Sequence, residues 1–122
     1  MNSEEMKLRL KKFSIRIIKM TEAMRKDDAK SVLSKQIIRS ATSSAANYRA
    51  ACRAKSTPDF INKLKIVEEE TDETMFWLEV IDECEYFKKG KLNELMKENE
   101  ELLKIVVASL KTSKNNSNKN SK

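Results

Sequence analysis

The sequence predicts an all-α protein that folds as an antiparallel up-down-up-down four-helix bundle, and three observations support this prediction. The 122 residues include one Gly and one Pro, which is too few for the frequent turns of a β-rich fold. Charged residues make up 36% of the chain and aromatic residues 6%, a composition typical of long amphipathic helices. Apolar residues also recur at steps of three and four along four segments with short connections, which indicates helices packed on their sequence neighbours.

The first helix is expected at residues 3–25 and the second at residues 29–54. Ser3 can cap the first helix, and Asp27 or Asp28 can cap the second, because their side-chain oxygens accept hydrogen bonds from the free amides of a first turn. The expected inner face of the first helix is Met6, Leu10, Phe13, Ile17, Met20 and Met24. That of the second is Leu33, Ile37, Ala41, Ser44, Tyr48 and Ala51.

The first helix is apolar on a second side as well. Leu8 and Ile15 lie away from its inner stripe, and a helix that is apolar on two sides usually contacts two partners. This pattern favours self-association of the chain.

The third helix is expected at residues 58–87 and the fourth at residues 92–110. Thr57 can cap the third helix, and Pro58 suits its first position because that position needs no amide hydrogen. Gly90 is expected to stop this helix in a left-handed turn. The inner face of the third helix is expected to be Phe60, Leu64, Val67, Thr71, Met75, Leu78 and Ile81. That of the fourth is expected to be Leu92, Leu95, Met96, Leu102, Leu103, Val106 and Leu110.

The chain is expected to divide into the bundle, residues 1–111, and a tail, residues 112–122. The tail is basic, polar and of low complexity, which predicts disorder because it has no apolar residues to bury.

Composition also disfavours several classes of protein. The N-terminal residues lack the apolar core of a secretory signal, and the longest apolar run, residues 105–108, is too short to cross a membrane. Cys52 and Cys84 lack the CxxC spacing of many metal sites. We expect both to behave as small hydrophobic residues in a reducing cytoplasm.

Charge is unevenly distributed along the chain, whose net charge is +6. Residues 1–57 carry 14 basic and 5 acidic side chains, a net charge of +9. Residues 58–87 carry 2 basic and 10 acidic side chains, a net charge of −8, and residues 88–122 carry 9 and 4, a net charge of +5. An acidic helix among basic helices can be neutralised within one subunit or between subunits.

Residues 35–49 form an unusual helix, because from Ser40 onward its faces carry small and polar side chains instead of Leu. Small side chains allow close helix approach, but buried hydroxyls and amides must then find partners. Ser40, Ser44 and Asn47 are therefore candidates for polar packing at a helix interface, together with Glu70, Glu73 and Trp77 of the third helix. Arg39 and Asn47 are the expected donors to the two glutamates.

The sequence does not favour an enzyme or a metal protein. The chain has no His, whereas the di-iron sites of helix bundles pair carboxylates with Glu-x-x-His motifs. It also lacks a glycine-rich phosphate loop and a nucleophile with an adjacent base. We therefore expect no cofactor, no metal and no catalytic residue.

Two basic stripes are candidates for binding nucleic acid. Residues on one face of the first helix are Lys12, Arg16, Lys19 and Lys26, and those on the second are Lys35, Arg39, Arg49 and Arg53. Such stripes can neutralise the phosphates of RNA or DNA, and the sequence pI of about 9.3 is consistent with this. Taken alone, each stripe is more simply explained as a solvated face or as a partner for the acids of the third helix.

Two segments carry a resemblance to a known family. LSKQIIRSATSSAANYRAA and STPDFINKLKIVEEETDETMFWLE resemble the bacterial four-helix bundle family that includes proteins encoded by intervening sequences in 23S rRNA genes, sometimes labelled S23 ribosomal proteins. The resemblance covers about residues 7–110. The matching positions are Gln36, Arg39, Ser40, Ser44, Asn47, Asp59, Phe60, Lys63, Leu64, Glu70, Glu73, Thr74, Trp77 and Leu78. The chain departs from the pattern at Ala46, where Gly is common, and at Ala50, where an acid is usual.

The resemblance implies a four-helix bundle that assembles as a ring-like homopentamer. Related bundles include the accessory protein of diversity-generating retroelements, which is linked to binding of nucleic acid and reverse transcriptase through basic surfaces. We therefore expect a non-enzymatic homo-oligomer that binds RNA or DNA non-specifically. The alternative is a structural or protein-interaction module, in which the basic second helix packs on the acidic third helix of a neighbour.

Overall fold

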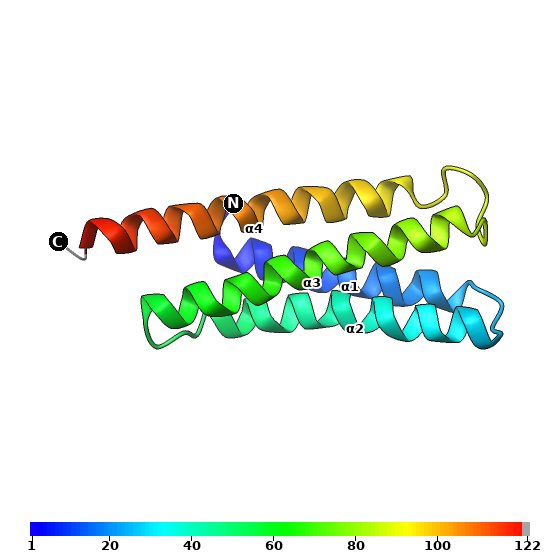
Figure 1. The fold of residues 1–122 in the computed structure, drawn as a ribbon, viewed down its shortest axis with the longest axis horizontal. Helices are drawn as coiled ribbons and strands as arrows, with labels where there is room; N and C mark the ends of the chain where they lie inside the picture. Colours follow the sequence, from blue (N-terminus) through cyan, green and yellow to red (C-terminus); the bar gives the residue numbers. More distant parts are fainter. Residues whose placement is uncertain (121–122) are drawn as a thin grey trace.

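The computed structural model describes residues 1–120, and within them it contains four α-helices and no strand (Figure 1). Helix α1 spans Ser3–Glu22, α2 spans Asp28–Ala51, α3 spans Thr57–Glu83 and α4 spans Asn93–Asn120. Successive helices run in opposite directions. Each packs on the next, and a smaller contact between α1 and α4 closes the bundle. The predicted all-α bundle is therefore confirmed.

The core consists of the predicted inner stripes. All six apolar residues predicted for the inner face of α1 are buried, and Ile17, Ile37, Leu64 and Leu102 have no exposed surface. The predicted core residues that are only half-buried are Leu33, Phe60, Met75, Met96 and Leu103. The step of three and four residues thus identifies the buried side of every helix, because that spacing keeps side chains on one face.

Three helices begin with a polar cap one residue from, or at, the predicted position. Asn2, not Ser3, caps α1, and its Oδ1 accepts a hydrogen bond from the Glu5 amide at 2.9 Å. Asp27 caps α2 in the same way through the Lys30 amide, also at 2.9 Å. Ser56 caps α3, so Thr57 is already helical. At each of these starts two adjacent polar residues could cap the helix, and the one with an extended backbone does so.

The first three helices end before their predicted ends. Helix α3 stops at Glu83, and Glu85 rather than Gly90 adopts the first left-handed conformation, with φ of 60°. Gly90, with φ of 86°, lies within the α3–α4 connection. Beyond α1, the Lys26 ammonium donates to the Thr21 carbonyl at 2.7 Å and so satisfies one of the carbonyls left free at the helix end.

Helix α4 corrects the expectation of a disordered tail. It continues past Leu110 to Asn120, and in Figure 1 its last turns reach beyond the start of α1. Residues 111–120 contain neither Gly nor Pro, so the last buried turn can propagate along the chain. Residues 121 and 122, the rest of the predicted tail, lie outside the described residues.

The two cysteines differ in environment. Cys52 is half-buried at the end of α2, whereas Cys84 is exposed, and both are free thiols. Cys84 therefore does not pack in the core as a small hydrophobic residue would. It follows the last residue of α3 and serves as its C-cap, a position at the end of the bundle that the apolar periodicity of α3 does not reveal. None of the helices in residues 1–120 combines the length and apolarity that crossing a bilayer would require.

Candidate functional site

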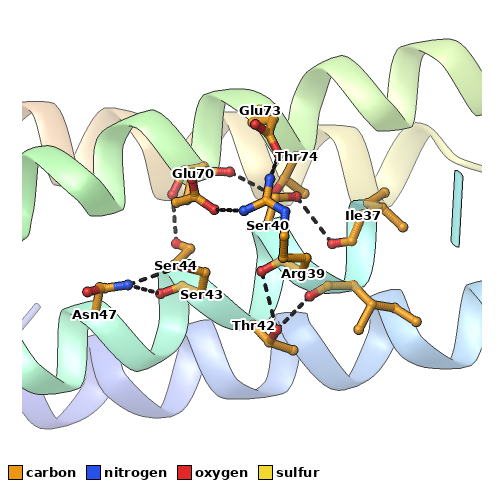
Figure 2. A network of polar contacts seen from close by, with 12 residues as sticks. Ile37, Arg39, Ser40, Thr42, Ser43, Ser44, Asn47, Glu70, Glu73 and Thr74 are labelled. Atoms are coloured by element: carbon orange, nitrogen blue, oxygen red, sulfur yellow. Dashed lines mark hydrogen bonds and ion pairs between the residues drawn. The ribbon is translucent and has the colours of Figure 1, made fainter. Parts of the chain in front are cut away.

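Helices α2 and α3 meet along four small hydroxyl side chains, which we call the hydroxyl seam: Ser40 and Ser44 on α2, and Thr71 and Thr74 on α3. Ser40 Oγ lies 2.8 Å from Thr74 Oγ1, and Ser44 Oγ lies 2.8 Å from Thr71 Oγ1. All four residues are buried. Figure 2 shows Ser40, Ser44 and Thr74 in the space between the two helices. Small residues here allow the close approach that the sequence predicted.

Thr71 donates to the Val67 carbonyl at 2.7 Å. A hydroxyl has one proton, so the Thr71 oxygen is left to accept from Ser44. In the other pair, Thr74 can donate to the Glu70 carbonyl at 2.8 Å and Ser40 to the Ile37 carbonyl at 3.2 Å, so either hydroxyl can be the donor between them. The seam is thereby satisfied by local geometry, with no need for water or ligand.

A buried amide extends this network to α4. Asn99 is 1% exposed, and its Nδ2 donates to the Thr71 carbonyl at 2.9 Å. Among the described residues, no buried side-chain nitrogen or oxygen lacks a hydrogen-bond partner. Sequence analysis missed Asn99, although its place between Leu95 and Leu102 on the inner stripe of α4 was the available signal.

Arg39 lies over the outer edge of the seam and pairs with both glutamates of α3. Its Nη1 is 2.8 Å from Glu70 Oε2, its Nη2 bonds Glu73 Oε2, and Trp77 Nε1 donates to the same Glu73 oxygen at 3.3 Å. Figure 2 shows the guanidinium between the two carboxylates. The expected pairing of Arg39 is therefore present. Its positive charge is compensated, which makes it a weaker candidate for binding phosphate.

Asn47 does not make the contact expected of it. Its Nδ2 donates to the Ser43 carbonyl at 2.9 Å and to Ser43 Oγ at 3.1 Å, both within α2 (Figure 2). The amide reaches a carbonyl one turn earlier, so its own helix satisfies it without any contribution from Glu70 or Glu73.

The other side of α2 borders an open groove of about 720 Å³ against α1, here called the α1–α2 groove. Its floor includes Leu8, Ile15 and Ile18 of α1 with Ala45 and Ala46 of α2. Its basic lining residues are Lys7 and Lys11 from α1, Arg49 from α2, and Arg53 just beyond the end of α2, and Glu4 pairs with Lys7 at 2.5 Å. The groove thus combines an apolar floor with a positive rim.

Lys7 and Lys11 were missed by sequence analysis. They lie next to Leu8, and Lys11 is four residues before Ile15, so all four share one side of α1. Examining which charges surround that second apolar side would have identified them.

Arg16, a member of the basic stripe predicted on the first helix, lies near an ion pair that joins α1 to α4. Arg9 makes two hydrogen bonds of 2.7 Å to Glu98 of α4, and these lower the pKa of the Glu98 carboxyl below its ordinary value. Arg16 lowers the same pKa further through its charge. Lys12 lies three residues after Arg9 and Lys19 three residues after Arg16, and both are exposed. None of Lys12, Arg16 and Lys19 lines the α1–α2 groove.

Lys26 and Lys35, the other predicted basic residues, lie outside the α1–α2 groove, and their environments differ. The Lys26 ammonium bridges the Thr21 carbonyl and Ser34 Oγ, at 2.7 and 2.8 Å, and so joins α1 to α2. Lys35 is exposed on α2 and has no ion pair among the described residues. Lys26 is thus a structural residue, whereas Lys35 keeps a free charge.

A second hollow lies at the end of the bundle, where α4 passes the connection between α2 and α3. Tyr48, Cys52, Phe60 and Ser113 are among its lining residues. Burial, together with the neighbouring Cys52 thiol, raises the pKa of Tyr48 to about 12, so its hydroxyl is neutral at physiological pH. Among the described residues, no three His, Cys, Asp or Glu side chains come together as a possible metal site.

Comparison with known proteins identifies a family and a similar solved structure. Residues 5–108 match the family described as 23S rRNA-intervening sequence protein. A crystal structure of a protein of unknown function from the S23 ribosomal protein family of Bacteroides thetaiotaomicron is 34% identical in sequence. The match covers 91% of this chain and 99% of that one, with a TM-score of 0.83. No curated protein matches the chain.

These matches agree with the resemblance carried by residues 33–79, which contain both sides of the hydroxyl seam and the Arg39 ion pairs. The chain belongs to the 23S rRNA-intervening sequence protein family.

Proposed function

We propose that the protein is a non-enzymatic homo-oligomer, a ring-like pentamer, that binds RNA or DNA non-specifically through basic helix surfaces. The proposal locates it in the cytoplasm, where Cys52 and Cys84 would stay reduced. It is supported by the separation of positive charge, on α1 and α2, from the acidic outer side of α3.

The observation that carries the proposal is the exposed row Lys12, Arg16 and Lys19 on α1. Lys12 and Arg16 have no ion pair among the described residues, and Lys19 has only an exposed pair with Glu22 at 3.4 Å. Spaced along one helix face, the three cations span about 10 Å at 1.5 Å per residue. A phosphate backbone offers negative charges at comparable intervals.

The first test measures binding of generic RNA and duplex DNA as a function of salt. The variant Lys12→Gln/Arg16→Gln/Lys19→Gln removes three positive charges without disturbing buried residues. If each contacts one phosphate, the slope of log affinity against log salt should fall in magnitude by about 2.7 for duplex DNA.

The matched control is Lys97→Gln/Lys104→Gln/Lys111→Gln, which removes the same charge from exposed positions of α4. It should leave most of the slope intact. No binding at low salt, or an equal loss in both variants, would contradict the proposed surface.

The second candidate function is a structural or protein-interaction module without nucleic-acid binding. The apolar floor of the α1–α2 groove favours it, since Leu8 and Ile15 are 47% and 49% exposed. Exposed apolar patches mark protein interfaces, and a phosphate backbone gains nothing from contact with them. Light scattering at micromolar concentration tests the assembly that both functions share, and a monomer would contradict it.

A further inference from the structure

We propose that the α1–α2 groove receives the outer face of α3 from a second copy of this chain, so that copies join head to tail. The inference rests on the self-association proposed above and names the two surfaces that would form it. It is carried by the groove, by a stripe on α3 with exposed apolar and acidic residues, and by the match between them in length and charge.

The groove requires an occupant with apolar side chains. Leu8 and Ile15 are among the large hydrophobic residues left exposed in the described chain, and they occupy the same groove as Ala45 and Ala46. Small residues on the α2 side leave room for side chains from a partner. Covering Leu8 and Ile15 would remove apolar surface from water, which is the main driving force of association.

Helix α3 carries a stripe that meets this requirement. Its members follow one another at steps of three and four residues and so share one face: Ile66, Glu69, Glu73, Phe76, Val80 and Glu83. Ile66 is 41% exposed and Phe76 is 54% exposed. The Phe76 ring packs edge-on against Trp77, with 4.9 Å between ring centroids, so the exposed ring is held by a neighbour on its own helix.

The charges of the two surfaces are opposite. Lys7, Lys11, Arg49 and Arg53 surround the groove, and only Glu4 among its lining residues is acidic. On the α3 stripe, Glu69 and Glu83 are exposed and have no ion pair among the described residues. Asp72 and Glu79 flank it, and Lys65 lies at its beginning. Complementary potentials of this kind select a partner and its orientation.

The lengths of the two surfaces also agree. The groove follows α1 from Glu4 to Ile18, about 21 Å, and the α3 stripe runs from Ile66 to Glu83, about 26 Å, at 1.5 Å per residue. Because groove and stripe are different parts of the chain, each copy keeps one of each surface free. Such a contact repeats, and it closes into a ring when the rotation between copies permits.

This docking assigns separate roles to the two basic stripes. Arg49 and Arg53 would meet the acids of a neighbouring α3, whereas Lys12, Arg16 and Lys19, which do not line the groove, would stay available to nucleic acid. Self-association and nucleic-acid binding can therefore be lost separately.

The first experiment exchanges the charges of the two surfaces and measures mass by light scattering. Arg49→Glu/Arg53→Glu should dissociate the assembly, because the rim would then repel the α3 stripe. Glu69→Arg/Glu83→Arg should do the same from the other side. Combining all four substitutions in one chain should restore the assembly, and this restoration distinguishes a direct contact from misfolding. Lys12→Gln/Lys19→Gln is the control and should leave the mass unchanged.

The second experiment tests proximity in a Cys52→Ala/Cys84→Ser background with diamide as the oxidant. A chain carrying both Ile15→Cys and Phe76→Cys should form a ladder of disulfide-linked multimers on a denaturing gel. Each substitution alone should give no cross-linked dimer, because like positions do not meet in a head-to-tail contact.

Three outcomes would overturn the inference. An assembly without the ladder, or without rescue by the four-fold variant, would place the interface elsewhere while leaving self-association intact. Dimers from Ile15→Cys alone would show that two grooves face each other. A monomer would remove both the inference and the proposed assembly, whereas nucleic-acid affinity would still be decided by the α1 variants.

Discussion

The two sides of α2 use small residues for opposite purposes. On the side of α3, Ser40 and Ser44 are buried, and their hydroxyls pair with Thr74 and Thr71 at 2.8 Å. On the side of α1, Ala45 and Ala46 border an open groove with exposed apolar residues and a basic rim. The same residue size thus permits a tight contact within the chain on one side and leaves space for a partner on the other.

This difference teaches that small residues indicate only that something approaches closely. The kind of partner depends on the polarity of the small residue. A buried hydroxyl at the seam must have a hydrogen-bond partner at a fixed position, whereas an alanine needs none. We therefore expect the unfolding free energy to depend on the seam and the assembly to depend on the groove.

The most direct way to break this comparison is to enlarge a residue on each side. Ser40→Leu forces a large side chain into a site with no exposed surface, and we expect the free energy of unfolding to fall by about 3 kcal/mol. Urea denaturation followed by circular dichroism measures it. Ala46→Leu, in the groove, is the control and should change the unfolding free energy by less than about 0.5 kcal/mol. Equal losses in the two variants would contradict the comparison.

The extension of the seam to α4 gives the next largest effect. Asn99→Ala removes a buried amide that donates to the Thr71 carbonyl at 2.9 Å and leaves a space, so we expect a loss of about 2 kcal/mol in unfolding free energy. Asn62→Ala, at an exposed position of α3, should have almost no effect in the same urea titration. A neutral Asn99→Ala would show that the seam ends at α3.

The Arg9–Glu98 contact between α1 and α4, unlike the contacts on either side of α2, should contribute to stability in a way that depends on pH. Hydrogen bonds from Arg9 lower the pKa of Glu98, so Glu98 stabilises the fold above its ordinary pKa of 4.5 and loses this contribution as pH falls through the lowered value. Arg9→Met should cost about 1.5 kcal/mol at pH 7. The difference between wild type and variant should shrink in acid, as measured by urea titrations at pH 7 and pH 2.5. A constant difference would mean that Arg9 acts only through packing.

The smallest expected effect concerns Arg39, at the outer edge of the seam. Its side chain is 49% exposed, and solvent screens ion pairs at such positions, so Arg39→Met should lower the unfolding free energy by no more than about 1 kcal/mol. Part of that loss should disappear in 1 M salt. A loss comparable to that of Ser40→Leu would mean that the ion pairs, and not the hydroxyls, hold α2 on α3.

Much of the fold could be predicted because helical periodicity is a local property. The inner stripe predicted for the first helix, from Met6 to Met24, is buried as predicted, although α1 itself ends at Glu22. The resemblance over residues 33–79 agrees with the matched family. The ends of the helices were predicted less well. Glu85 adopts the left-handed conformation before Gly90, and α4 continues to Asn120, because the last turn of a helix depends on neighbouring segments as well as on its own residues.

The sequence by itself determined the helices, their buried sides and the segregation of charge. Only the tertiary structure decided which charges share a surface. It joined Lys7 and Lys11 to Arg49 and Arg53 around one groove, which Lys12, Arg16 and Lys19 do not line. The reason is that periodicity gives each residue an angle on its own helix, whereas the surface that it forms depends on how neighbouring helices are rotated and packed.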